Sequence, residues 1–217
     1  MEKLFDAIRK SNIELVKDLI SSDANLVNSI SIKGLKKDNG QYPLQVAIKT
    51  NNIDIANYLI DNNANVNFIE KDSTNEWKAP VIHDALRTAI TNTRWNTFDG
   101  NIKVFHTKEE SDKAFSLLKK IIDLGADVNA HDSYHNSCLD RALLDCRQIL
   151  PYYDIEKDLL SKDRVLTDEI KEDISRIIKI LIDNGADVNE RNINSNKSFK
   201  EAANNSAISK CLTFDIK

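Results

Sequence analysis

IIDLGADVN occupies residues 121–129, and ILIDNGADVN occupies residues 180–189, so the same ending returns after 60 residues. Both stretches join an apolar helix end to a glycine and then to the letters Ala-Asp-Val-Asn. An agreement in several features at once indicates a repeated structural unit rather than a coincidence. The Val-Asn ending therefore serves as a marker for the boundaries of that unit.

The marker occurs at Asn67, Asn129 and Asn189 and, in the looser form ANLVN, at Asn28. Apolar pairs stand seven and eight positions before each of the last three markers, and a second set stands eleven and twelve positions before them. The nearer pairs are Leu59 and Ile60, Ile121 and Ile122, and Leu181 and Ile182; the farther are Ile55 and Ala56, Leu117 and Leu118, and Ile177 and Ile178. Spacings of three and four place these residues on one stripe of a helix.

A second marker lies upstream in each unit, where a bulky apolar residue stands three positions before an alanine. The pairs are Leu4–Ala7, Leu44–Ala47, Ile82–Ala85, Leu139–Ala142 and Phe199–Ala202. Each unit thus reads as helix, turn, helix and polar link. Gly125 and Gly185 follow the second helix where a left-handed residue would end it, and Asn63 holds the same place in the second unit.

These residues resemble the ankyrin repeat. The family motif TPLHLAA is echoed by YPLQVAI (42–48) and PVIHDAL (80–86), and its GADVN ending appears twice. The resemblance implies an all-α helical repeat solenoid of about four repeats plus a C-terminal capping unit, with short inter-repeat hairpins. It also implies one domain over 1–217, with repeats at about 1–38, 39–76, 77–134 and 135–194 and a cap at 195–217.

The resemblance assigns His83 a structural hydrogen bond between neighbouring units. Gln45 and Asp140 stand at the matching position of two other units. We therefore expect an incomplete version of that hydrogen-bond network.

The third and fourth units are too long for the family. The markers at Asn28, Asn67, Asn129 and Asn189 are 39, 62 and 60 residues apart, whereas the family period is ~33 residues. The surplus lies in insertions between the two helices, at about 94–112 and 149–173. Asp99-Gly100 predicts a small β-hairpin or an apolar-tipped loop in the first. Leucine spacing and dense charge predict extra helix in the second, with a break at Pro151, and the two insertions should lie side by side.

Composition narrows the class of function. The chain has 217 residues, a net charge of −4 and 41% hydrophobic residues, so no overall charge attracts it to nucleic acid or to an anionic membrane. No apolar run reaches the roughly 18 residues of a membrane span. The first twenty residues read as folded helix rather than as a signal peptide. Three sparse cysteines favour a reducing compartment, hence the cytoplasm, or the host cytosol for a secreted effector.

Patterns that carry chemistry are scarce. The isolated glycines form no phosphate-binding loop. His131, His135 and Cys138 could gather around zinc, but their spacing is unlike that of known zinc frameworks. The carboxylates of Glu169, Glu172 and Asp173 are interpreted as a solvated helix face. We expect no catalytic residue, no metal and no cofactor.

The favoured function is therefore non-enzymatic recognition of another protein by a monomer, with neither nucleic acid nor membrane as partner. The resemblance implies contact positions at the tips of the links: His131, Ser133, Tyr134 and Asn136, then Arg191, Ile193, Asn194 and Asn196, with Lys36, Lys37, Glu70, Lys71 and Trp77 in the longer first links. Aromatic anchors are typical of interfaces, and the candidates are Trp77, Trp95, Phe98, Tyr152 and Tyr153.

For Trp95 and Phe98, burial of the insertion's own aromatics against the scaffold is an equal expectation. A narrower hypothesis is a bacterial or viral inhibitor that docks through both insertions. The alternative is an enzyme or a small-ligand or zinc-binding module whose site the insertions form.

Overall fold

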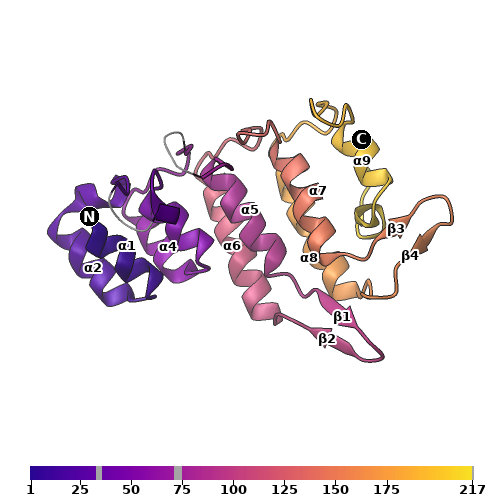
Figure 1. The fold of residues 1–217 in the computed structure, drawn as a ribbon, viewed down its shortest axis with the longest axis horizontal. Helices are drawn as coiled ribbons and strands as arrows, with labels where there is room; N and C mark the ends of the chain where they lie inside the picture. Colours follow the sequence, from indigo (N-terminus) through magenta and orange to yellow (C-terminus); the bar gives the residue numbers. More distant parts are fainter. Residues whose placement is uncertain (33–35, 71–74, 217) are drawn as a thin grey trace.

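The computed structural model describes residues 1–32, 36–70 and 75–216. Its helices stand in successive pairs along one row (Figure 1). The pairs are α1 (Glu2–Arg9) with α2 (Ile13–Ser22), α3 (Pro43–Lys49) with α4 (Ile53–Asp61), α5 (Val81–Thr91) with α6 (Lys108–Asp123), and α7 (Cys138–Ile149) with α8 (Asp168–Asp183). This arrangement confirms the predicted all-α repeat solenoid.

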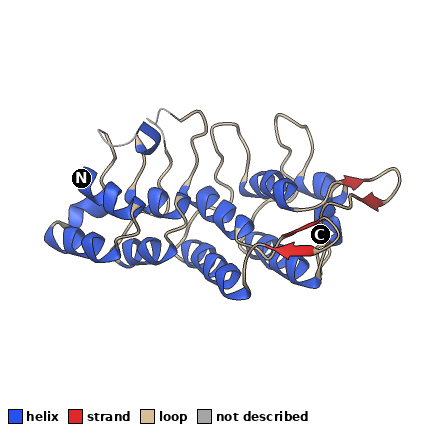
Figure 2. Ribbon diagram, turned by 60° about the horizontal axis from the view of Figure 1, so that its bottom comes forward, coloured by secondary structure: helices blue, strands red, loops and turns tan. Residues whose placement is uncertain are grey.

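The helices form two rows, and the links between repeats rise from one edge (Figure 2). Each first helix packs on the next first helix, from α1 through α3 and α5 to α7, and the second helices α2, α4, α6 and α8 do the same. The five bulky marker residues are all buried: Leu4, Leu44, Ile82, Leu139 and Phe199. They occupy equivalent places because each one fills the space between neighbouring helix pairs.

Short helical elements lie near the two ends of the row and in the first link. The chain has a 3₁₀ turn η1 (Ala24–Asn28) after α2 and another, η2 (Lys36–Asp38), in the first link. Beyond the last repeat, α9 (Phe199–Asn204) and the 3₁₀ turn η3 (Ala207–Lys210) cover the end of the stack against α7. Within the described residues, the strand pairing of the links consists of two isolated β-bridges, Ile69 with Pro80 and Arg191 with Ser198.

Helix ends follow the local chemistry of the sequence. Gly125 and Gly185 have φ values of 85° and 90°, and Asn63 has a φ of 66°. All three sit just after the second helix of a pair, where a left-handed residue ends the helix. At the other end of the helices, Ser137 caps α7 and Thr107 caps α6 through reciprocal bonds with a carboxylate three residues later.

The repeated asparagine connects each repeat to the following one through side-chain hydrogen bonds. Asn67 donates its side-chain N–H to the Gly125 carbonyl at 3.0 Å and accepts the Asp127 N–H at 3.1 Å. Asn129 makes the same two bonds at 2.9 Å to Gly185 and Asp187, and Asn28 makes them at 3.0 and 2.8 Å to Asn63 and Asn65. One amide thus satisfies a donor and an acceptor of the following repeat, which explains why the ending recurs in the sequence.

The first insertion forms the predicted hairpin. Strands β1 (Asn96–Phe98) and β2 (Ile102–Val104) pair antiparallel, with Phe98 opposite Ile102. Asp99 and Gly100 lie in the turn between them, and Gly100 has a φ of 108°. Beyond β2, residues 108–112 already belong to α6.

The prediction of extra helix in the second insertion is wrong for most of its length. Strands β3 (Tyr153–Asp154) and β4 (Leu159–Leu160) form a two-residue ladder, and helix resumes only at Asp168, as the beginning of α8. Tyr153, Leu160 and Leu166 pack against the core from this non-helical chain. The prediction took the apolar residues of this segment for one face of a helix. They instead contact the core from strands and irregular chain.

The two insertions lie side by side, as predicted. The Phe98 N–H donates to the Asp163 carbonyl at 2.7 Å. The Asn96 side chain donates to the Val165 carbonyl at 2.8 Å and accepts the Val165 N–H at 2.9 Å. In Figure 1 the β1–β2 hairpin projects at the edge opposite the links, whereas the β3–β4 hairpin extends beyond α9 at the C-terminal end of the row.

Candidate functional site

Asp132 organises the tip of the third link. Its carboxylate accepts hydrogen bonds from the Trp77 indole at 2.8 Å and from the backbone N–H groups of Tyr134 and Asn136, each at 2.9 Å. Burial alone would raise the pKa of Asp132, but these hydrogen bonds outweigh it and lower the pKa. Asp132 therefore holds Trp77, which comes from the preceding link, against the third tip.

The other predicted residues of the third tip differ in exposure and in the contacts they make. Tyr134 is exposed, and so is His131, whose ring nitrogen lies 2.8 Å from a Glu190 carboxylate oxygen. Ser133 joins the neighbouring link by accepting the Lys78 N–H at 3.0 Å. Asn136 is buried against Asp132 and points away from solvent, so it acts in the stack rather than at an open surface.

The fourth tip stands beside the third. The Asn194 side chain donates to the Tyr134 carbonyl at 2.8 Å. Ile193 is 67% exposed, which leaves it and Tyr134 as apolar groups on adjacent tips. Arg191 is engaged with Glu201 at 3.0 Å, and Asn196 takes a positive φ of 52° that turns the link.

The contact positions predicted in the first two links differ in burial. Glu70 is buried and accepts a hydrogen bond from Lys49 at 3.1 Å, so it does not face a partner. Lys36 is exposed. Lys71 and the side chain of Lys37 lie outside the described residues.

The insertions divide their aromatic residues between packing and exposure. Trp95 stacks on Phe105 at a centroid distance of 4.0 Å and donates to the Thr91 carbonyl at 3.2 Å, whereas Phe98 is exposed. In the second insertion, Tyr153 donates to Asp158 at 2.6 Å and packs on the core, whereas Tyr152 is 74% exposed. Trp95 thus packs on its own insertion and on α5, whereas a binding role for the exposed Phe98 stays a prediction.

Seven exposed apolar side chains gather on the two hairpins, and we call them the insertion surface. They are Phe98, Ile102, Val104, Phe105, Tyr152, Ile155 and Leu159. Phe98, Ile102 and Val104 share one face of the first hairpin because paired and alternate residues of an antiparallel ladder point the same way.

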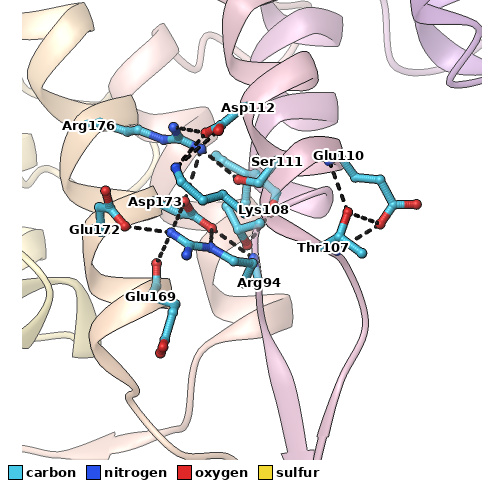
Figure 3. Close-up of polar contacts among 12 residues, drawn as sticks. Arg94, Thr107, Lys108, Glu110, Ser111, Asp112, Glu169, Glu172, Asp173 and Arg176 are labelled. Carbon is cyan, nitrogen blue, oxygen red and sulfur yellow. Dashed lines mark hydrogen bonds and ion pairs between the residues drawn. The ribbon is translucent and has the colours of Figure 1, made fainter.

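A buried ion pair fixes this surface to the repeats. Arg94, at the base of the first hairpin, donates to Asp173 of α8 from its Nε at 3.0 Å, its Nη2 at 2.9 Å and its backbone N–H at 2.9 Å (Figure 3). The same Nη2 reaches Glu172 at 2.7 Å and the Glu169 carbonyl at 3.2 Å. The side-chain hydrogen bond to Asp173 raises the pKa of Arg94 above its ordinary value.

The interpretation of Asp173 as part of a solvated face is therefore wrong, because its side chain is fully buried. The signal was in the spacing. Asp173 stands three residues after Ile170 and four before Ile177, so it lies on the buried stripe of α8.

The sequence interpretation also missed a row of cations on the first helices. Arg9, Lys49 and Arg87 each stand two residues after the marker alanine of their unit. All three line one open groove, together with Trp77. The shared repeat position is the signal that could have identified them.

The predicted role of His83 is confirmed. Its ring Nε2 lies 2.9 Å from the carbonyl of Ala130 in the next link, and burial lowers its pKa to about 4. Gln45 and Asp140, which hold the position of His83 in two other repeats, also connect repeats. Gln45 donates to the Ala79 carbonyl at 3.2 Å, and Asp140 accepts from the Asn192 side chain at 3.0 Å. The network is more complete than the sequence interpretation allowed.

Asp84 follows His83 in the same helix, and its pKa shifts in the opposite direction. It is buried, and desolvation raises its pKa to about 7 against the opposing effect of Lys49. Between pH 3.8 and about 7 the folded chain therefore holds a proton that the unfolded chain has released, so the contribution of Asp84 to stability falls as pH rises. For His83, between about 4 and 6.5, the unfolded chain holds the extra proton, so its contribution rises with pH.

Asp84→Asn should separate the pH dependence of stability due to Asp84 from that due to His83. We expect the variant to exceed the parent in free energy of unfolding by about 1–2 kcal/mol near pH 8, because a buried charge is gone while an acceptor for Gln45 remains. Below pH 6.5 its stability should fall more steeply with acidification, since the slope from His83 is no longer offset. Urea unfolding across this pH range measures both effects; a variant curve parallel to that of the parent contradicts the assignment.

The residues proposed for zinc do not converge. Cys138 is buried at the start of α7, where burial raises the pKa of its thiol, and His131 faces Glu190. Within residues 1–32, 36–70 and 75–216, no three side chains of His, Cys, Asp or Glu are placed to hold a metal ion. All three cysteines are buried free thiols. Across the same described ranges, every helix is too short or too polar to cross a bilayer.

Comparison with known proteins agrees with the geometry. A family model described as ankyrin repeats (3 copies) matches residues 4–94. A protein of fowlpox virus (strain NVSL), named as an ankyrin repeat protein, is 26% identical over 126 residues, which is 58% of this chain. The aligned region spans 17% of that viral relative.

Proposed function

Because the chain belongs to the ankyrin repeat family, we propose that it is a non-enzymatic module that recognises another protein. Residues 1–217 act as one domain and as a monomer, with repeats at about 1–38, 39–76, 77–134 and 135–194 and a cap at 195–217. The cytoplasm, or the cytosol of a host, is the proposed site of action. The partner is a protein, and neither nucleic acid nor a membrane is required.

The insertion surface is the observation that supports this proposal most strongly. It consists of exposed aromatic and aliphatic side chains on the hairpins of the two insertions. Tyrosine is one of the residue types enriched at the hot spots of protein interfaces, and Tyr152 is 74% exposed. Exposed apolar side chains that lie close together often mark a site where a partner binds.

Rigid mounting makes the surface effective. Arg94 connects the first hairpin to α8, and the bonds from Asn96 to Val165 connect it to the segment that follows the second hairpin. A surface that is already ordered loses little conformational entropy on binding. The adjacent tips with Tyr134 and Ile193 offer further apolar contacts on the link edge.

A narrower form of the proposal is an inhibitor or effector from a bacterium or a virus that blocks a target through its insertions. The similarity to a fowlpox virus protein supports the viral version. Two insertions in consecutive repeats would suit it, because together they make a larger protruding surface than a standard repeat array offers.

Replacing Phe98 and Ile102 by serine tests the proposal. The partner is first captured from the native cell by the immobilised parent chain and identified, and its affinity for each variant is then measured. We expect the double variant to bind at least about tenfold more weakly, which corresponds to about 1.4 kcal/mol. Leu124→Ser, which alters an exposed leucine directly after α6 and outside the insertion surface, is the control. Equal affinity of the parent and the double variant would contradict a role for the insertion surface.

A further inference from the structure

A groove of about 930 Å³ runs over the first helices of repeats one to three, on the face away from the second helices. Arg9 of α1, Lys49 of α3 and Arg87 of α5 line it, and Trp77 forms part of its wall. His106, towards the end of the first insertion, also lines it. The groove is thus separate from the insertion surface, although it begins beside the same hairpin.

The three cations repeat with the spacing of the helices. They hold the same position in successive units, and neighbouring packed helices lie about 8–10 Å apart. An extended polyproline II chain advances about 3.1 Å per residue and returns to the same side every third residue, which is about 9 Å. A carboxylate at every third residue of such a chain would therefore meet one cation per repeat.

Buried carboxylates hold Arg9 and Lys49 in place from below. Arg9 forms an ion pair with Asp38, and Lys49 forms one with Glu70 at 3.1 Å. Asp38 and Glu70 are both buried, whereas parts of both cations remain open to the groove. The cations are therefore fixed in position and still face the groove, which lowers the cost of ordering them when a ligand binds.

Arg87 is the cation most open to a ligand. It is exposed, and within the described part of the chain no carboxylate lies within ion-pair distance of it. Its guanidinium carbon lies 5.7 Å from the centre of the Trp77 ring. Stacking on an aromatic face orients a guanidinium while its N–H edge stays free to bind a carboxylate.

Two further cations lie over the ring of Trp77. Lys49 lies 5.7 Å and Arg141 lies 5.4 Å from the centre of its ring, and its indole N–H is fixed on Asp132. The groove also holds two acids, Glu76 and Asp84. Asp84 is buried with a raised pKa, so it carries less than a full charge at neutral pH. Apart from the buried Asp84, the charged residues of the described lining are therefore the three cations Arg9, Lys49 and Arg87 and one exposed acid, Glu76, in a chain whose net charge is −4.

We propose that this groove binds an extended acidic segment of the partner protein, with carboxylates about three residues apart that pair with Arg9, Lys49 and Arg87. The inference rests on the proposed function and adds the chemistry of one partner segment to it. Binding weakens with added salt because the contacts are ionic. The insertion surface and the groove then engage separate parts of the partner.

Fluorescence anisotropy with a labelled peptide of repeated Glu-Pro-Ser tests the inference on the full chain. We expect saturable binding that Arg87→Gln weakens about tenfold, while Arg147→Gln, an exposed arginine outside the groove, leaves it unchanged. A Lys-Pro-Ser peptide should not bind. A peptide of the same composition with its glutamates contiguous should bind several-fold more weakly.

Three outcomes would overturn the inference: equal weakening by Arg147→Gln, equal affinity for the peptide with contiguous glutamates, or displacement of the acidic peptide by tighter binding of an oligothymidylate. Phe98→Ser with Ile102→Ser separates this inference from the proposed function. That variant should retain the acidic peptide while it loses the captured partner. Failure of the peptide to bind, with partner capture still dependent on the insertions, would reject the groove and keep the proposed function.

Discussion

Arg94→Ala should lower the free energy of unfolding by about 3 kcal/mol, because it leaves the carboxylate of Asp173 buried without its principal cation. The parent arginine gives Asp173 two side-chain hydrogen bonds as well as one from the backbone. The backbone bond survives the substitution, and Arg176 stays 3.0 Å from Asp173. These remaining contacts keep the expected loss at the lower end of the range for a broken buried pair.

Urea unfolding followed by circular dichroism measures this loss. Arg147→Ala, at an exposed arginine of α7, should change stability by no more than about 0.5 kcal/mol. Replacing both partners, Arg94→Met with Asp173→Leu, should recover much of the loss because no charge is then left buried. Arg94→Ala with parental stability would mean that the insertions are not anchored through this pair.

Ile82→Ala should cost about 3 kcal/mol and also divide the unfolding transition. Ile82 is buried in the third repeat, and removing its side chain leaves a cavity between α5 and its neighbours. In a repeat stack each unit is stabilised only by the units beside it. Weakening the middle of the row should therefore let the first two repeats unfold separately from the last two.

The slope of the denaturation curve reports this separation, since it scales with the surface exposed in one transition. We expect a reduced slope or two transitions for Ile82→Ala. Ile102→Ala, at an exposed residue of the first hairpin, is the control and should leave the slope unchanged. A single transition of parental slope would show that the row unfolds as one unit, against this expectation.

Most of the fold could be predicted from the sequence because stacking imposes the same demands on every unit. A residue such as Leu44 or Leu139 must fill the gap between repeats, and Asn67 or Asn129 must satisfy the backbone of the next one. These demands recur at fixed intervals, so they remain visible although the insertions separate the units. The turn at Asp99-Gly100 was visible for a similar reason, as its chemistry is local.

The remainder depended on contacts that no local pattern reveals. The apolar residues of the second insertion, such as Leu160 and Leu166, pack on the core without a helix. Asp173 is polar by type yet buried, because Arg94 lies 79 residues away in the chain and next to it in the fold. Asn136 was assigned to an open tip, but Asp132 and Asn192 bind it inside the link.

The candidate site was predicted less well than the fold for the same reason. Exposure of Tyr152, Phe98 and Ile193 follows from how each loop folds back, which residue type alone does not determine. The cations of the groove carried a periodic signal in Arg9, Lys49 and Arg87, and that signal became clear only when the helices were aligned in space.

Nuclear Overhauser effects in the folded chain test the central claim most directly, namely that the units stack in one register through their asparagines. The account predicts contacts between the Asn67 side-chain amide protons and the Asp127 backbone amide proton, and between those of Asn129 and Asp187. Spectra that show the local contacts of every helix but lack both of these long-range pairs would contradict it.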